Sequence, residues 1–373
     1  MIYFDNSATT CPYEAVTALM AQEAQAHFAN ASSLYRPALW AEEGIRAAKA
    51  AVAKVLHCAA EEVLITSGGT YANNLAVIGG TLARKRMGNR VVLTKVEHPS
   101  VYACGAVLEE QGFEVIYADP TFESIADAIN EKTVMVAVMM VNNELGLRLP
   151  VERIAAVIRR KKAPAHFHID GVQAFCKIPT SVAALKCDSF SLSAHKIKGP
   201  KGIGALYLKK GTRVRNITVG GEQERGIVPG TYNSPAAAGF AKAIELYEQE
   251  DLTHFERLRA HFLTRAKELP FLQINSPEDG VPYIQNVSVL GYLGENVLHF
   301  LEEREIYVSQ GSACSSKKYR SHSVLGRLGY HEQTVMGALR ISFGIENTTE
   351  EIDTLMDALA EVPEKIQKLY KDV

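Results

Sequence analysis

The chain reads Ser189-Phe190-Ser191-Leu192-Ser193-Ala194-His195-Lys196 just past its midpoint. Hydroxyl and apolar side chains alternate at first, which is the pattern of a half-buried β-strand. Residues 199–204 contain three glycines and a proline, so the strand should end in a turn. Lys196 would then lie at the buried end of a strand, where an ammonium group is costly unless the lysine is neutral or covalently modified. A neutral lysine amine can form a Schiff base with an aldehyde cofactor, whereas the alternative is a lysine that extends to solvent.

Short apolar runs alternate with amphipathic stretches on both sides of this segment. Such alternation predicts an α/β fold with a mostly parallel sheet covered by helices. Strands are expected at residues 63–65, 91–93, 115–117, 134–141, 167–169, 190–193 and 203–208. Helices are expected at residues 38–56, 100–111 and 151–161.

The pattern changes after Ser234. One long helical stretch is expected at residues 236–269, followed by strands at 285–290, 306–309 and 339–343. A chain of 373 residues is long enough for two domains. We therefore expect a large cofactor-binding domain over residues 15–250, and a smaller α+β domain formed by residues 1–14 and 251–373.

Composition excludes several classes of protein. The net charge of −2 and the lack of a long basic run argue against nucleic acid as a partner. No apolar segment approaches membrane-spanning length, and the N-terminus lacks the pattern of a signal peptide. The six cysteines are scattered without a Cys-x-x-Cys pair, so neither a disulfide framework nor a structural metal site is expected. A reducing cytoplasm fits this usage best.

Two segments at predicted strand ends carry candidate ligand-binding groups. Ser67-Gly68-Gly69-Thr70 follows a strand and precedes a helix, where free amide groups would suit a phosphate, although such a sequence can also be a simple turn. Asp170 ends another strand, and ligands of open α/β sheets bind at the carboxyl ends of the strands. A buried Asp170 needs a partner such as a protonated pyridine nitrogen, but an aspartate there can also cap a helix.

Two further strand ends carry polar side chains. His98 follows the strand that ends near Thr94, and it could stack on an aromatic ring or move a proton. Asn142 and Asn143 close the apolar run 134–141, and their amides could bind a ligand or make a turn. An isolated histidine is more often structural, so each of these signals is weak alone.

Taken together and in order, these segments resemble the class V aminotransferase family of pyridoxal-phosphate enzymes. More closely, they are similar to the cysteine desulfurases of the nitrogen-fixation and iron–sulfur-cluster type. The resemblance covers essentially the whole chain. Its motifs are Asp5-Asn6-Ser7-Ala8-Thr9-Thr10, Thr66-Ser67-Gly68-Gly69-Thr70, Glu97-His98-Pro99, Val141-Asn142-Asn143-Glu144, Asp170-Gly171-Val172-Gln173, Ser193-Ala194-His195-Lys196, Gly221-Glu222-Gln223-Glu224-Arg225-Gly226, Gly311-Ser312-Ala313-Cys314-Ser315 and Ala338-Leu339-Arg340-Ile341-Ser342-Phe343-Gly344.

The resemblance implies a fold-type-I pyridoxal-phosphate transferase and a role for each matching residue around the cofactor ring. Lys196 would carry the internal aldimine, and Asp170 would keep the pyridine nitrogen protonated. His98 would stack on the ring and assist proton transfer, and Gln173 and Asn143 would lie near the ring hydroxyl oxygen.

The resemblance also assigns the phosphate and the substrate. Arg340 would pair with the substrate carboxylate, with Asn143 nearby, a task that suits a planar guanidinium. The alternative for Arg340 is a surface salt bridge, but apolar residues flank it on a predicted strand. The residues that would bind the phosphate are Gly69, Thr70, Ser193 and His195, together with Thr231 of the partner subunit in a homodimer.

Cys314 lies in a small, polar and basic segment, unlike the surroundings of a core cysteine. The neighbouring Lys317 and Lys318 would favour its thiolate. On a mobile loop, that thiolate could take sulfur from a cysteine substrate as a persulfide and carry it to an acceptor protein. The other five cysteines are expected to be buried and inert: Cys11, Cys58, Cys104, Cys176 and Cys187.

The chain departs from the family pattern at Tyr35, Tyr71, Val228 and Tyr232, where charged residues or histidine are usual. We expect the last three to meet across the dimer interface. The resemblance implies conversion of L-cysteine to L-alanine with a persulfide left on Cys314. The alternatives are a selenocysteine lyase, another class V reaction, and a weakly active scaffold for a sulfur carrier. The sequence does not name the acceptor or its pathway, such as iron–sulfur clusters, transfer-RNA thiolation or selenium metabolism.

Overall fold

The computed structural model describes residues 1–310 and 323–369, which form two compact units. The larger unit comprises Cys11–Val141 and Leu149–Gln249, and the smaller comprises Met1–Thr10, Asn142–Arg148 and Glu250–Val373. This division differs from the expected domains at residues 11–14 and 142–148, and at the single residue Glu250. The second difference has a clear cause, because the backbone nitrogen of Val281 donates to the carbonyl of Gly146 at 2.8 Å and ties the segment to the smaller unit.

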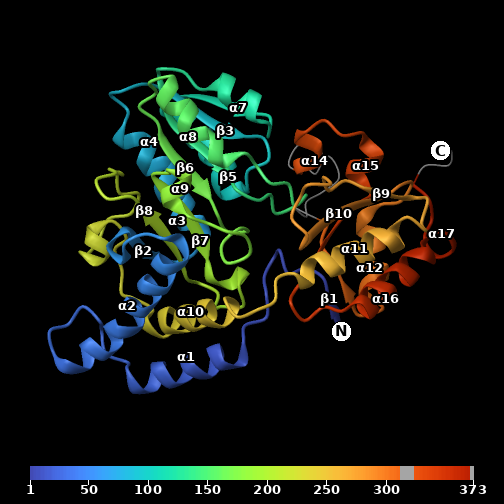
Figure 1. Cartoon of the computed structure of the whole chain (residues 1–373), viewed down its shortest axis with the longest axis horizontal. Coiled ribbons are helices and arrows are strands. Elements are labelled where there is room, and N and C mark those ends of the chain that lie inside the picture. The colour runs from blue at the N-terminus through green and yellow to red at the C-terminus, as the bar shows by residue number, and fades with distance from the viewer. Residues whose placement is uncertain (311–322, 370–373) are drawn as a thin grey trace. The chain divides into compact units, whose positions relative to one another are not determined.

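A seven-stranded sheet forms the centre of the larger unit (Figure 1). Its order is β2-β8-β7-β6-β5-β3-β4. β8 runs antiparallel to β2 and β7, whereas the other neighbours are parallel, so the predicted mostly parallel sheet is confirmed. The strands are β2 (Val63–Thr66), β3 (Arg90–Thr94), β4 (Glu114–Ala118), β5 (Thr133–Met139), β6 (His166–Asp170), β7 (Ser189–Ser193) and β8 (Gly204–Leu208).

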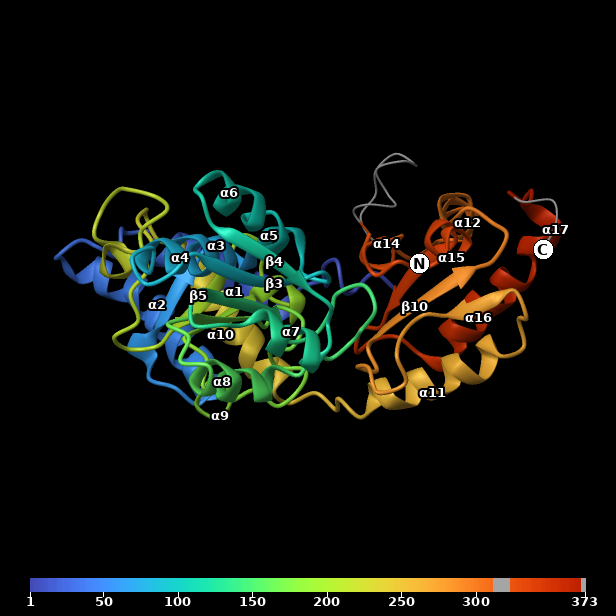
Figure 2. The ribbon, with the colours of Figure 1, turned by 90° about the horizontal axis from the view of Figure 1, so that it is seen from above.

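Helices cover both faces of this sheet. Figure 2 shows α5 and α6 on one side of β3 and β4, and α8 and α9 on the other side. The helices of this unit are α1 (Glu14–Ala26), α2 (Arg36–Leu56), α3 (Gly69–Asn74), α4 (Gly80–Ala83), α5 (Pro99–Tyr102), α6 (Cys104–Glu110), α7 (Phe122–Ala128), α8 (Val151–Arg160), α9 (Val182–Leu185) and α10 (Ser234–Tyr247). A π-helical segment, Leu75–Gly79, joins α3 to α4, and its end residues keep right-handed helical angles, so residues 69–83 form one helical stretch.

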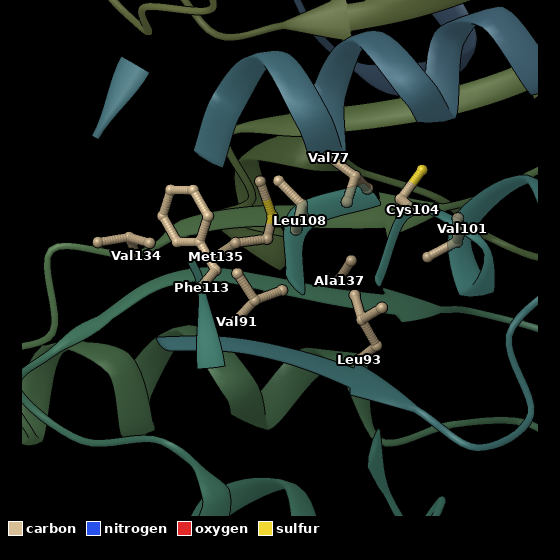
Figure 3. Close-up of a cluster of buried hydrophobic side chains, with 10 residues drawn as sticks. All are labelled: Val77, Val91, Leu93, Val101, Cys104, Leu108, Phe113, Val134, Met135 and Ala137. Atoms are coloured by element: carbon tan, nitrogen blue, oxygen red, sulfur yellow. The ribbon is translucent and has the colours of Figure 1, made fainter. Parts of the chain in front are cut away.

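The core beneath α5 and α6 is made mostly from aliphatic side chains. β5 is buried along its whole length, as expected for a central parallel strand with helices on both faces. Figure 3 shows the cluster that results, with side chains of β3 and β5 facing those of α6 and the π-helical segment. Its buried members are Val77, Val91, Leu93, Val101, Cys104, Leu108, Phe113, Val134, Met135 and Ala137.

The smaller unit is α+β. It contains an antiparallel sheet of order β12-β10-β9 and a parallel pair, β1 with β11. Its strands are β1 (Ile2–Tyr3), β9 (Leu272–Ile274), β10 (Ile284–Val289), β11 (Ile306–Tyr307) and β12 (Ala338–Ser342). Its helices are α11 (His254–Ala266), α12 (Gly294–Glu302), α14 (Val324–Arg327), α15 (Glu332–Met336), α16 (Thr349–Ala360) and α17 (Val362–Lys365).

Two local expectations are wrong. The helix expected at residues 236–269 is two helices, α10 and α11, because the chain turns at Asp251, whose carboxylate accepts a hydrogen bond from the backbone of Thr253 at 3.0 Å. The strand β7 is buried on both faces rather than half-buried. On its hydroxyl face, Ser189 contacts two histidines of β6 and Ser191 donates to Asn73 of α3. Among the described residues, no helix combines the length and apolarity needed to cross a membrane.

Candidate active site

The carboxyl ends of β6 and β7 lie side by side and carry the polar residues predicted from the sequence. Asp170 is the last residue of β6 and pairs in register with Ser191 on β7. Ser193 ends β7, and a short 3₁₀ turn, Ala194–Lys196, follows it directly. Parallel strands thus place Asp170 and the lysine-bearing turn at one edge of the sheet, where open α/β sheets bind ligands.

Asp170 is only 4% exposed, yet both of its carboxylate oxygens accept hydrogen bonds. Oδ1 accepts from the backbone nitrogen of Val172 at 3.0 Å, and Oδ2 accepts from Nδ2 of Asn73 at 2.8 Å. Close packing holds the turn after it, because a Cβ at Gly171 would lie 1.9 Å from the ring of Phe190. The carboxylate is therefore fixed in place, as a partner for a protonated ring nitrogen must be.

His98 caps α5 and leaves its ring exposed. Its Nδ1 accepts a hydrogen bond from the backbone nitrogen of Ser100 at 3.1 Å and lies 2.8 Å from the hydroxyl of Ser100. With Nδ1 as the acceptor, the neutral ring carries its proton on Nε2. The ring is thus fixed at its Nδ1 edge by Ser100.

Beneath these groups, two histidines of β6 are fully buried. Nε2 of His166 and Nδ1 of His168 both contact the hydroxyl of Ser189, at 2.6 and 2.8 Å. Nε2 of His168 lies 2.9 Å from Oδ1 of Asn73. Burial lowers the pKa of His168 to about 3 and that of His166 well below its ordinary value. Both rings are therefore neutral at physiological pH.

The turn that carries Lys196 is strongly electropositive. Burial, followed by the charges of Lys196, Lys201 and Lys177, lowers the pKa of His195 to about 4. His195 is therefore neutral at physiological pH, and the charges of Lys201 and Lys177 act on it even if Lys196 is covalently modified. A phosphate anion fits such a place, because it would be attracted by the lysines and could accept a hydrogen bond from a neutral imidazole.

The predicted phosphate turn has a backbone that requires glycine. Gly68 has φ +142°, a conformation that other residues rarely adopt. A Cβ on Gly69 would lie 2.7 Å from Val172, so the turn packs closely on the segment after Asp170. Thr70 follows in the first turn of α3 and is exposed. The start of the helical stretch 69–83 thus lies beside the end of β6, with amide groups suited to an anion.

Arg340 lies on β12 in the smaller unit and is 6% exposed. Its Nη2 forms an ion pair with Oδ1 of Asp5 at 2.7 Å, and its Nη1 donates to the carbonyl oxygen of Asn143 at 3.0 Å. Arg340 is thus not a surface salt bridge. The pairing with Asp5 was not expected from the sequence, although Asp5 opens the first of the motifs quoted above.

The segment after Asn143 is anchored within the same unit. The side chain of Asn142 accepts hydrogen bonds from the backbone nitrogens of Glu144 and Leu145, so Asn142 shapes the turn, which was the simpler of its two expected roles. Glu144 accepts from the backbone nitrogen of Val324 at 3.2 Å. Burial raises the pKa of Glu144, while Val324, Arg340 and Arg327 oppose that effect.

The other predicted site residues occupy different surroundings. Gln173 is buried in the turn after β6, and Thr231 is exposed before α10. Cys314 lies outside the described residues. Five cysteines were expected to be buried. Cys104 and Cys187 are buried, whereas Cys58 and Cys176 are only partly buried and Cys11 is exposed.

Three of the departures from the family pattern have contacts within one chain, and their expected meeting across a dimer interface stays a prediction. Tyr71 and Val228 pack against one hydrophobic cluster within a single chain, together with Ile227. A contact across a dimer interface is therefore not needed to explain them. The hydroxyl of Tyr232 accepts a hydrogen bond from the backbone nitrogen of Glu224 at 3.1 Å.

Sequence reasoning missed Asn73, Ser100 and His168, which join the predicted residues. One signal was present, because His166, His168 and Asp170 alternate along β6 and therefore share a face. Three polar residues on a buried face require partners, and the serines of β7 at matching positions supply some of them.

Comparison with known proteins identifies the family. The model of class V aminotransferases matches residues 2–355. The chain belongs to the class V aminotransferase family. Members of this family are pyridoxal-phosphate-dependent enzymes, which agrees with the lysine, aspartate and phosphate turn found at one edge of the sheet.

Relatives within the class V aminotransferases match along almost the whole chain. Cysteine desulfurase IscS of Clostridium botulinum (strain Hall) is 35% identical, over 97% of this chain and 94% of its own length. Cysteine desulfurase IscS of Methanosarcina thermophila is 32% identical, over 99% and 93%. A solved NifS-like protein has a TM-score of 0.90 at 32% identity and covers 97% of this chain and 99% of its own. SspA in complex with cysteine has a TM-score of 0.81 at 30% identity and covers 93% of this chain and 100% of its own.

Proposed function

We propose that this protein is a cysteine desulfurase that uses pyridoxal phosphate to convert L-cysteine to L-alanine and leaves the sulfur as a persulfide on Cys314. One structural observation carries the proposal. At adjacent strand ends, a buried carboxylate with both oxygens held, Asp170, lies beside an electropositive turn that ends in Lys196. The relatives named cysteine desulfurase, which match nearly the whole chain, support the choice of reaction.

The residues present fit the cofactor. Lys196 would hold it covalently, and Asp170 would accept a hydrogen bond from the protonated ring nitrogen. His98 would lie against the ring, and Gln173 and Asn143 would lie near its hydroxyl oxygen. When bound, pyridoxal phosphate supplies an electron sink that makes the bonds around the substrate α-carbon labile. The residues that would bind its phosphate are Gly69, Thr70, Ser193 and His195, with Thr231 of the partner subunit.

The substrate would be held and cleaved by groups of the smaller unit. Arg340 would bind the substrate carboxylate, while Asp5 and the carbonyl of Asn143 keep its guanidinium oriented. The thiolate of Cys314 would attack the substrate sulfur, so that a sulfur–sulfur bond forms and the carbon–sulfur bond breaks. The electron pair of the broken bond stays on carbon, which takes up a proton and becomes the methyl group of alanine.

The same proposal extends to partners and location. We propose a homodimer, in which the exposed Thr231 reaches the partner's cofactor site, and a sulfur-acceptor protein that receives the persulfide. A reducing compartment such as the cytoplasm suits the enzyme, because its five described cysteines are free thiols.

The test is an assay for alanine and sulfide from L-cysteine with purified protein and added pyridoxal phosphate. Wild type should release alanine, and borohydride should fix the cofactor to Lys196, as located by mass spectrometry. Lys196→Ala should abolish both results. Lys210→Ala is the matched control, because Lys210 is an exposed lysine just past β8, at the opposite end of β7 from Lys196, and should keep both. An adduct on another lysine, or alanine release by Lys196→Ala, would refute the assignment.

A further inference from the structure

Asn73 contacts four polar side chains at the centre of the site and is only 1% exposed. Its Nδ2 donates to Oδ2 of Asp170 and to the hydroxyl oxygen of Ser100, both at 2.8 Å. Its Oδ1 accepts from the hydroxyl of Ser191 and lies 2.9 Å from Nε2 of His168. One amide thus links β6, β7 and α5 from its position on α3.

The surroundings leave one orientation for this amide. A carboxylate offers only acceptors, so the NH₂ group must face Asp170. The carbonyl oxygen then faces His168, whose Nδ1 can accept from Ser189 while its Nε2 donates to Asn73. Each group in the series of hydrogen bonds from Ser189 through His168 and Asn73 to Asp170 therefore has a complementary partner. Buried polar networks of this kind hold their members rigidly.

The contact between Asn73 and Ser100 extends this hydrogen-bonded network to a second proposed site residue, His98. The hydroxyl oxygen of Ser100 accepts from Asn73, which leaves its proton free to be donated to Nδ1 of His98 at 2.8 Å. Both N–H groups of Asn73 are therefore used, one toward Asp170 directly and one toward His98 through a single serine. Asp170 and His98 are the two residues proposed above to meet the nitrogen and the face of the cofactor ring.

We propose that Asn73 is a positioning residue that fixes Asp170 and His98 relative to each other before the cofactor binds. This inference rests on the proposed cofactor and adds a residue to its site. Asparagine suits the position because it presents two donors and two acceptor lone pairs within one short planar group. A site whose ring partners are already oriented loses less entropy when the ring binds.

The test uses pyridoxamine phosphate, which has no aldehyde and so reports ring and phosphate contacts without the covalent link to Lys196. Its affinity for the cofactor-free protein is measured by calorimetry for wild type and Asn73→Ala. Loss of hydrogen bonds that orient a charged group should weaken binding roughly tenfold or more. The absorption maximum of bound pyridoxal phosphate should also shift in Asn73→Ala, since two ring contacts change together.

Asn74→Ala is the matched control. Asn74 is the next residue of α3, and its Nδ2 donates to the backbone carbonyl of Ser100 at 2.8 Å. It therefore ties α3 to α5 without touching Asp170 or the hydroxyl of Ser100. Asn74→Ala should lower the melting temperature but keep the affinity within about twofold and leave the spectrum unchanged. Equal affinities and spectra for Asn73→Ala and wild type would overturn the inference.

Ser100→Ala provides the second variant, because it removes only the hydroxyl through which Asn73 reaches His98 and keeps the backbone N–H that donates to Nδ1 of His98. The affinity of Ser100→Ala for pyridoxamine phosphate should fall between those of wild type and Asn73→Ala. The variant that combines Asn73→Ala with Ser100→Ala should lose no more binding free energy than the sum of the two single losses. If Asn73→Ala does not fold, wild-type affinity and spectrum in Ser100→Ala overturn the inference. Failure of wild type itself to bind pyridoxamine phosphate would instead refute the proposed function.

Discussion

Nη2 of Arg340 lies 2.7 Å from Oδ1 of Asp5, and this ion pair joins the first motif of the chain to the last. The guanidinium side chain is nearly buried, whereas the carboxylate is about one-fifth exposed. Three of the five N–H groups of a guanidinium remain after its two contacts with Asp5 and the carbonyl of Asn143. Arg340 is thus oriented by its own unit and retains donors for a substrate carboxylate.

Arg340→Ala should reduce kcat/KM for cysteine by roughly thirtyfold or more, because a charge-assisted pair contributes about 2 kcal/mol. The absorption band of the bound cofactor should not change. Asp5→Asn is the comparison variant, since it keeps an oxygen acceptor for Nη2 and leaves the charge of Arg340 available. Asp5→Asn should lower the free energy of unfolding by more than it raises the activation free energy calculated from kcat/KM. The opposite ranking would count against the role given to Arg340.

Cys314→Ser should bind pyridoxal phosphate normally but release no alanine, because a hydroxyl oxygen cannot accept sulfur as a persulfide. Cys11→Ser is the control, since Cys11 is an exposed thiol. It should retain wild-type alanine release, measured with the same enzyme concentration and cysteine. Near wild-type turnover by Cys314→Ser would exclude the persulfide step.

The buried histidines predict acid sensitivity. The pKa of His168 is about 3 in the folded chain, below its ordinary value of 6.5. Between these values the unfolded chain binds a proton that the folded chain does not, so the free energy of unfolding decreases as pH falls from 6.5 toward 3, by up to about 1.4 kcal/mol per pH unit for one such group. Urea unfolding across this range should show a shallower decrease for His168→Gln than for wild type. An identical slope in both proteins would mean that His168 protonates freely when folded.

Val228→Arg should lower the free energy of unfolding by about 1–3 kcal/mol, because it places a guanidinium against an apolar cluster that includes Leu64 and Leu75. Val219→Arg is the control at a valine that is 91% exposed, and it should have little effect. Chemical denaturation of both variants, at several protein concentrations, separates this local effect from one on a dimer. A loss of stability that depends on concentration would restore the dimer contact expected from the sequence.

Patterns local to the chain predicted most of the fold. The seven strands of the larger unit were found because each is a short apolar run between turn residues. The failures were of another kind. β1 and β9 were missed because strands of two or three residues carry almost no periodic signal. The break between α10 and α11 was missed because the amphipathic pattern continues across it.

The site divides in the same way. Asp170 and Lys196 could be predicted because they lie at or just after the ends of strands, where the rule for ligand position in α/β sheets applies to each strand separately, whereas Ser193 was predicted only from the family resemblance. Asn73, Ser100 and His168 could not be, because their importance lies in contacts among three elements that are distant in sequence. The same holds for Asp5 with Arg340, which are 335 positions apart.

The sequence by itself predicted most of the strands and helices, the family, and a set of candidate reactive side chains, because these depend on local periodicity and short motifs. Only the tertiary structure decided which of these side chains are buried and what holds them. A polar face on β7 could equally have met water, and it is the packing of α3 over β6 and β7 that turned it into a closed hydrogen-bonded network. Burial and partners are properties of the folded chain as a whole, since desolvation depends on every element that covers a group.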